Sequence, residues 1–71
     1  DKNELKRILA YNMKVERLKR DWTQANLAEK SSVSLKHITK IECKNVIPSI
    51  YIVQKIANAF EVSIDTLLKA P

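Results

Sequence analysis

The sequence of 71 residues predicts an all-α fold of five helices. Apolar residues recur every three or four positions along most of the chain, which is the period of an amphipathic helix. Threonine or serine stands immediately before four of these segments, where its side chain can accept a hydrogen bond from the free backbone N–H groups of a starting helix. No segment carries a strand pattern. The capping residues are Thr23, Ser34, Ser49 and Ser63.

The first predicted helix covers residues 3–20, which contain neither proline nor glycine. Its apolar stripe follows the helical period and consists of Leu5, Ile8, Tyr11, Val15, Leu18 and Trp22, widened by Leu9 and Met13. Its polar side carries Lys6, Arg7, Lys14, Lys19 and Arg20. A solvated helix face is the ordinary explanation for these charges, and phosphate contact by some of them is the alternative.

Two short helices follow, at residues 24–30 and 35–43, joined by a turn at Ser31 and Ser32. Each begins with a hydrophobic staple, in which the apolar residue before the cap packs on the fourth helical residue. The staple pairs are Trp22 with Leu27 and Val33 with Ile38. The inner faces of these helices are narrow, so they can be buried only against each other and a further support.

A loop over residues 44–48 leads to a fourth helix from Ile50, with the inner stripe Ile50, Val53, Ile56, Ala57 and Phe60. Val62, Ser63 and Leu67 repeat the staple and predict a last helix from residue 64 to 68 or 69. Residues 1–71 are expected to form a single domain. A chain of this size buries only roughly 60% of its unfolded surface, so the core should be small.

Composition limits the classes of function. The net charge of +5 favours a polyanionic partner, although residues 1–20 hold seven basic and three acidic residues against six and five in residues 21–71. Cys43 and His37 are single, which disfavours disulfides and metal sites, and we expect no cofactor. No phosphate-binding glycine loop or nucleophile with its base is present, so an enzyme is not expected. No membrane span or leader is seen, which favours the cytoplasm.

The outer face of the segment 35–43 is short, basic and polar. On a wheel of about 100° per residue, Ile38, Ile41 and Glu42 share one side, and Lys36, Lys40 and Cys43 lie opposite. Such a helix fits the major groove of B-DNA, with an ordinary solvated surface as the alternative. The predicted base contacts are Leu35, Lys36, Thr39 and Lys40, although each lysine can instead contact phosphate and the wheel puts Leu35 nearer the buried side. Gln24 suits a phosphate contact at a helix start, and His37 can approach a phosphate.

The carboxylate of Glu42 is expected on the inner side of its helix, where it would be costly without a basic partner. Arg17 on the first helix is the predicted partner.

Several short motifs stand in a fixed order between Met13 and Leu68. They are Arg17, Thr23-Gln24, Leu27-Ala28-Glu29-Lys30, Val33-Ser34, Ile38, Ile41-Glu42, Pro48-Ser49-Ile50, Ile56-Ala57, Ala59-Phe60, Val62-Ser63 and Leu67-Leu68. In this order and spacing the chain resembles the phage repressor and Cro-like helix-turn-helix family, also called the xenobiotic response element family.

The resemblance implies a compact, five-helix, lambda-repressor-like DNA-binding domain whose segment 35–43 enters the major groove. Members usually bind two-fold symmetric operators on double-stranded DNA as homodimers, and repression is the commoner outcome. Carried over by position, Leu35, Lys36 and Lys40 become base contacts. Arg17 and Glu42 correspond to the family's buried ion pair. The backbone contacts that it implies are Gln24, Ser34, Cys43, Lys44 and Asn45.

The sequence departs from the family at four positions. Ser32, Lys44 and Glu61 replace glycines in turns, so each turn is expected to be strained by roughly 1 kcal/mol or differently shaped. Glu16 occupies a position that is often apolar, and Leu18 is expected to compensate.

The predicted function is that of a sequence-specific transcriptional regulator, most simply a repressor. An antitoxin or a restriction-modification controller would bind DNA in the same way. A protein-interaction module is the other alternative, but Lys36 and Lys40 are poor anchors for a protein partner. The dimer surface is expected on the fourth and last helices, around Tyr51, Ile52, Ile64 and Leu68.

Overall fold

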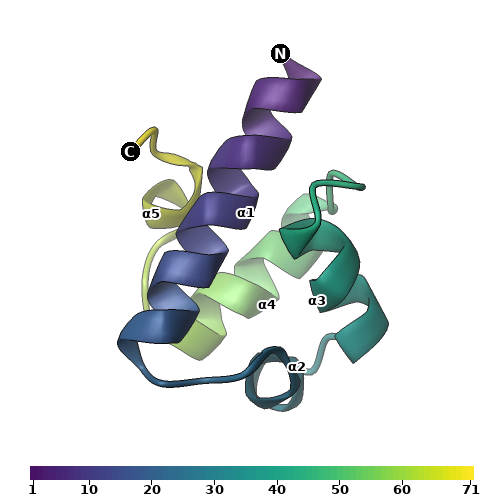
Figure 1. Cartoon of the computed structure of the whole chain (residues 1–71). Helices are drawn as coiled ribbons and strands as arrows, with labels where there is room; N and C mark the ends of the chain where they lie inside the picture. The colour runs from purple at the N-terminus through teal and green to yellow at the C-terminus, as the bar shows by residue number, and fades with distance from the viewer.

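Five helices and no strand make up the computed structural model, which describes residues 1–71 (Figure 1). The all-α prediction is therefore confirmed. The helix predicted over residues 35–43 ends one residue earlier than expected, because Cys43 is its C-cap. The helices are α1 (Lys2–Lys19), α2 (Gln24–Ser31), α3 (Leu35–Glu42), α4 (Ile50–Phe60) and α5 (Ile64–Leu68).

Every helix starts with a side-chain cap, and the four predicted caps are all present. Thr23 Oγ1 accepts from the Asn26 backbone N–H at 3.0 Å, while the Asn26 side chain accepts from the Thr23 N–H at 2.9 Å. The two bonds form a capping box, which satisfies donors at the first turn of α2. The hydroxyls of Ser34, Ser49 and Ser63 each accept from the N–H three residues later.

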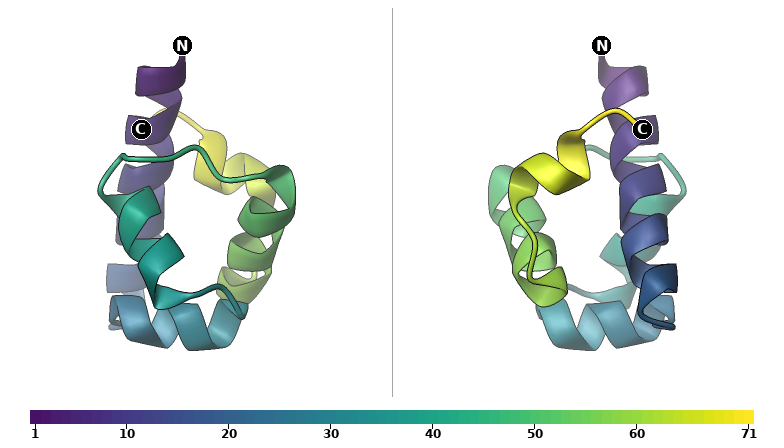
Figure 2. Two further views of the ribbon diagram at one scale, coloured as in Figure 1. Left: turned by 90° about the vertical axis from the view of Figure 1, so that its right-hand side faces the viewer. Right: turned by 90° about the vertical axis from the view of Figure 1, so that its left-hand side faces the viewer.

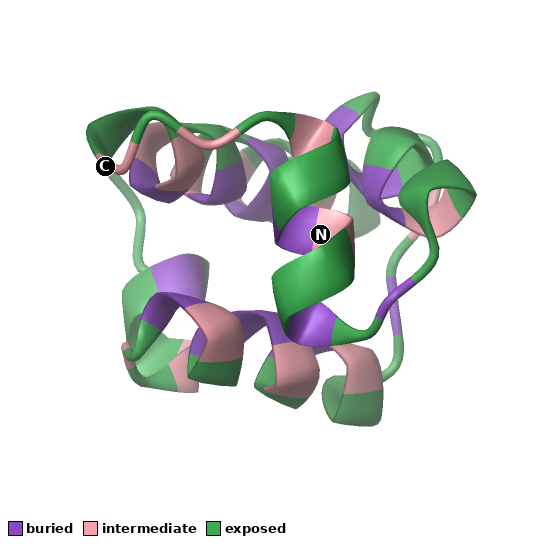
Figure 3. Cartoon of the chain, turned by 90° about the horizontal axis from the view of Figure 1, so that it is seen from below, coloured by how far each residue is buried: buried purple, intermediate pink, exposed green.

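The helices surround one shared core. Helix α1 packs against α3 and α5, whereas α2 packs against α3 and α4. The left view of Figure 2 shows α3 and α4 on opposite sides, with α2 running across their lower ends. Figure 3 shows the buried segments turned toward the interior. The core cluster draws on all five helices and on the turn before α3. It contains Leu9, Met13, Leu27, Val33, Ile38, Ile41, Val53, Ile56, Ala57, Phe60 and Leu67.

The apolar stripe predicted for α1 is centred on the wrong side. Tyr11 is 54% exposed and Leu18 is 58% exposed, so Leu18 does not compensate for Glu16. The buried residues of α1 are Leu9, Ala10, Met13 and Glu16 itself. Helical spacing alone could not find this face, because one of its members is a glutamate.

Local ion pairs make the burial of Glu16 possible. Its Oε1 accepts from Arg20 Nη1 at 2.8 Å and its Oε2 from Lys19 Nζ at 3.3 Å. Arg20 also donates through Nη2 to the Phe60 carbonyl at 2.7 Å, and its guanidinium lies 5.0 Å from the Phe60 ring centroid. Trp22 stacks on Phe60 with centroids 5.5 Å apart. Glu16 therefore holds an arginine that ties the end of α1 to the end of α4.

A left-handed residue follows each of the first four helices. Ser32, Lys44 and Glu61 have φ of 59°, 65° and 59°, and Asp21 has φ of 56°. In each case the next N–H donates to a carbonyl five residues back, as from Val33 to Ala28 at 3.2 Å. This is the Schellman ending, which usually uses glycine. The turns at Ser32, Lys44 and Glu61 thus have the shape that glycine would give. Each of these residues adopts the left-handed conformation despite its Cβ, which costs free energy.

Candidate nucleic-acid interface

The two sides of α3 differ sharply in burial. Ile38, Ile41 and Glu42 are buried, while Lys36, Thr39 and Lys40 are exposed. Leu35 is 47% exposed, so it belongs to the outer face despite its position on the wheel. The structure's three salt bridges involve neither lysine of this helix. An unpaired basic face is thus available to an anionic partner.

A hollow of about 340 Å³ lies at the first turns of α3. It brings together several residues that the sequence assigns to DNA contact. Its lining residues are Ser34, Lys36, His37, Lys40 and Val46. Because Ser34 caps the helix, the free N–H groups of the first turn lie beside these basic side chains. The hollow combines hydrogen-bond donors with positive charge, which is the chemistry that holds phosphate oxygens.

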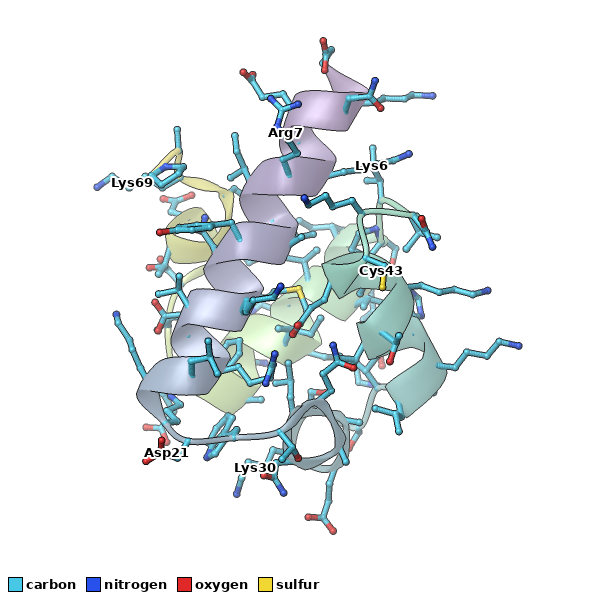
Figure 4. All side chains as sticks on the ribbon, in the orientation of Figure 1. Lys6, Arg7, Asp21, Lys30, Cys43 and Lys69 are labelled. Atoms are coloured by element: carbon cyan, nitrogen blue, oxygen red, sulfur yellow. The ribbon has the colours of Figure 1, made fainter.

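The C-terminal end of α3 presents a second group of predicted contacts. Cys43, Lys44 and Asn45 are all exposed there, and Figure 4 shows Cys43 at the end of α3, on the side of the molecule opposite Lys69. Lys44 lines a hollow of about 450 Å³ together with Arg7 and Lys14 of α1. The sequence did not predict that Arg7 and Lys14 lie near Lys44. Their position depends on how α1 is rotated about its axis, and the apolar periodicity placed its buried face wrongly.

A chain of hydrogen bonds links α1, α2 and α3 beneath this face. Arg17 donates to Glu42 through Nε at 2.9 Å and through Nη2 at 3.0 Å. Gln24 Nε2 donates to Glu42 Oε1 at 3.1 Å, and Thr39 Oγ1 donates to Gln24 Oε1 at 3.0 Å. The predicted partners Arg17 and Glu42 are thus in contact. Gln24, expected only as a phosphate contact, is also an internal bridge.

No three His, Cys, Asp or Glu side chains gather as metal ligands. None of the helices combines the length and the apolar character that crossing a membrane requires.

Comparison with known proteins identifies the family and the fold. A family model described as helix-turn-helix, HTH_3, matches residues 13–67. A protein of Neisseria meningitidis serogroup B named as a hypothetical transcription factor is 30% identical over 71 residues, which are all of this chain and 67% of that protein.

Two crystal structures resemble the fold closely. A hypothetical transcription factor from Neisseria superposes with a TM-score of 0.92 at 30% identity, covering 100% of this chain and 82% of that one. An HTH_3 family transcriptional regulator from Vibrio cholerae gives a TM-score of 0.90 at 25% identity, covering 94% of this chain and 38% of that one. The resemblance seen in the sequence is confirmed, and the chain belongs to the helix-turn-helix family HTH_3.

Proposed function

We propose that the chain is a sequence-specific, double-stranded DNA-binding transcriptional regulator that acts in the cytoplasm by inserting α3 into the major groove. The observation that carries the proposal is the exposed basic face of α3, fixed from behind by Arg17 and Glu42. A helix presented in this way fits the width of the major groove. Repression is the simplest mode of action, because a protein bound at an operator excludes others from the DNA that it covers.

Each residue of the face has a role that follows from its chemistry. Leu35 can touch a thymine methyl, while Lys36 and Lys40 can donate to guanine O6 and N7 or to phosphate. Thr39 faces a base edge from the middle of the helix. Contacts to the DNA backbone come from both ends of the motif. They involve Gln24, Ser34, His37, Cys43, Lys44 and Asn45.

A second copy of the chain is the proposed partner on the exposed side of α4. Ile50 and Tyr51 are each 67% exposed there, and Lys55 is the only charged residue of the helix. Two copies that each carry a net charge of +5 can approach through such a face with least repulsion.

Nearby apolar residues extend this surface. Leu5, Ile47, Ile50 and Leu68 line one apolar groove of about 220 Å³ beside it. Ile52 and Ile64, which the sequence analysis expected at the dimer surface, instead pack against the core. Ile50, which it expected on the inner stripe, is exposed and takes their place in the proposed surface. A two-fold interface here would set the recognition helices about 34 Å apart, one DNA turn.

Selection of bound duplexes from a random DNA library tests the proposal. The chain is compared with Lys36→Ala and Lys40→Ala, and with Lys69→Ala as a control on the side away from Cys43 (Figure 4). We expect a symmetric site to be enriched by the parent chain and the control. Loss of affinity without a change of preferred sequence would assign the two lysines to phosphate. Failure of the parent chain to enrich any symmetric site would refute the proposal.

A further inference from the structure

The hydrogen bonds that run from Arg17 to Thr39 can be made in only one direction. The carboxylate of Glu42, paired with Arg17, can only accept, so the amide that faces it must be Gln24 Nε2. The amide oxygen of Gln24 must then face Thr39, at 3.0 Å from its hydroxyl oxygen. An oxygen of this kind can only accept, so Thr39 must donate. A buried ion pair therefore sets the orientation of an exposed hydroxyl two hydrogen bonds away.

The hydroxyl of Thr39 has a single hydrogen, and that hydrogen points inward to Gln24. Thr39 is exposed on the outer face of α3, so its remaining lone pairs are available to a partner in the groove. An oxygen without a free hydrogen can accept from the amino groups of adenine N6 or cytosine N4. It cannot bond guanine O6 or N7 or thymine O4, which are themselves acceptors.

We propose that Gln24 is a positioning residue that restricts Thr39 to reading an amino-bearing base, adenine or cytosine, at one position of each half-site. This inference rests on the proposed function and deepens it, because it names the base class read by one side chain and the residue that imposes that choice. A free threonine hydroxyl would rotate and serve as donor or acceptor, so it would discriminate weakly among bases.

Gln24 can contact a phosphate and still fix the direction of the Thr39 hydrogen bond. One hydrogen of its Nε2 is held by Glu42 Oε1, and the other remains for a phosphate oxygen. Glu42 is only 5% exposed, so losing the bond from Gln24 would leave a buried carboxylate with one donor fewer, and this cost keeps the amide in place. Gln24 can therefore contact the backbone and orient Thr39 at the same time.

The test compares base preferences, position by position, for duplexes selected from a random library. We expect the parent chain and Thr39→Ser to prefer adenine or cytosine at one position of the half-site by roughly tenfold. Thr39→Val, which has the same shape without the hydroxyl, should lose this preference there and nowhere else. Gln24→Ala should relax the same position, because the freed hydroxyl can then donate as well as accept. Asn45→Ala, a predicted backbone contact, should lower affinity without changing any preference.

A second measurement removes the partner atom instead of the side chain. Replacing the read adenine by purine, or the read cytosine by 2-pyrimidinone, deletes only the amino group. This change should weaken the parent chain about tenfold and leave Thr39→Val nearly unaffected. Circular dichroism checks folding, and Gln24→Met, which keeps the length of the side chain without the amide, takes the place of Gln24→Ala if that variant does not fold.

Two results would overturn the inference while leaving DNA binding intact. One is a Thr39→Val variant with unchanged preferences at every position. The other is a Gln24→Ala variant that loses affinity equally for all sequences. If the parent chain enriches no site at all, the proposed function fails first and this inference fails with it.

Discussion

Arg17 and Glu42 join α1 to α3 through two parallel hydrogen bonds of 2.9 and 3.0 Å. Their side chains are only 12% and 2% exposed. Arg17 uses its remaining Nη1 to donate to the Trp22 carbonyl at 2.9 Å, which anchors the segment between α1 and α2 as well. No buried side-chain nitrogen or oxygen lacks a hydrogen-bond partner anywhere in the structure. The pair therefore fixes α3 against α1 and against the segment that leads into α2.

Removing one member of this pair should be strongly destabilising. In Arg17→Met, Glu42 keeps a buried carboxylate with only Gln24 to stabilise it, so the free energy of unfolding should fall by about 3–5 kcal/mol. Urea denaturation followed by circular dichroism measures the change. The double variant Arg17→Met with Glu42→Leu removes both charges and should recover part of the loss. A double variant that is no more stable than Arg17→Met would show that the lost bond to the Trp22 carbonyl, not the unpaired charge of Glu42, causes the destabilisation.

Local chemistry was predictable from the sequence wherever neighbouring residues determine it. The caps at Thr23 and Ser34 and the partnership of Arg17 with Glu42 follow from short-range rules and from the cost of a buried charge. The rotation of α1 about its axis could not be predicted in this way, because the burial of Glu16 depends on a bond from Arg20 to the carbonyl of Phe60, 40 residues along the chain. Apolar periodicity cannot signal a buried ion pair.

The candidate site shows the same division. Exposure of Lys36 and Lys40 follows from the helical wheel alone. The bond between Thr39 and Gln24 does not, because it depends on how closely α2 and α3 approach. The exposure of Ile50 was also missed, since the first residue of a helix can face outward although it continues the apolar spacing.

Glu16 should make stability depend on pH in the acid range. Hydrogen bonding from Arg20, helped by Lys19 and opposed by burial, lowers the pKa of the Glu16 carboxyl below its usual 4.5. The stabilisation is therefore fully present above about pH 4.5 and is lost as the pH falls through the lower pKa of the folded state. Glu16→Gln should cost about 1–3 kcal/mol at pH 7 and much less at low pH, measured by urea denaturation across pH.

The matched control for this prediction is Glu29→Gln, since Glu29 is exposed on α2 and takes part in none of the salt bridges. Its stability should follow that of the parent chain at each pH. A constant gap between Glu16→Gln and the parent from pH 7 down to the acid range would contradict the assignment.

Relieving the left-handed conformation of Glu61 should stabilise the fold. Its φ of 59° costs a residue with a Cβ roughly 1 kcal/mol, and glycine avoids that cost. Part of the gain is offset because glycine makes the unfolded chain more flexible, so Glu61→Gly should add about 0.5–1 kcal/mol to the free energy of unfolding. Thermal unfolding measures the shift.

A comparison variant separates backbone strain from charge at this position. Glu61→Gln removes the negative charge from the C-terminal end of α4 but keeps the Cβ, so it reports only the interaction with the helix dipole. We expect Glu61→Gly to exceed Glu61→Gln in stability. Equal stability of the two variants would mean that the strain relieved is no larger than the cost of glycine's flexibility in the unfolded chain, and would contradict the prediction.

A charge on the exposed side of α4 should weaken self-association. Ile50→Lys places two like charges close together across the proposed two-fold interface, and the dimer dissociation constant should rise at least tenfold, or about 1.4 kcal/mol. Sedimentation equilibrium measures this constant. Leu18→Lys is the matched control, because Leu18 is 58% exposed on the last turn of α1, whereas Ile50 is 67% exposed at the start of α4. If Leu18→Lys weakens association and Ile50→Lys does not, the two copies meet through the end of α1 instead.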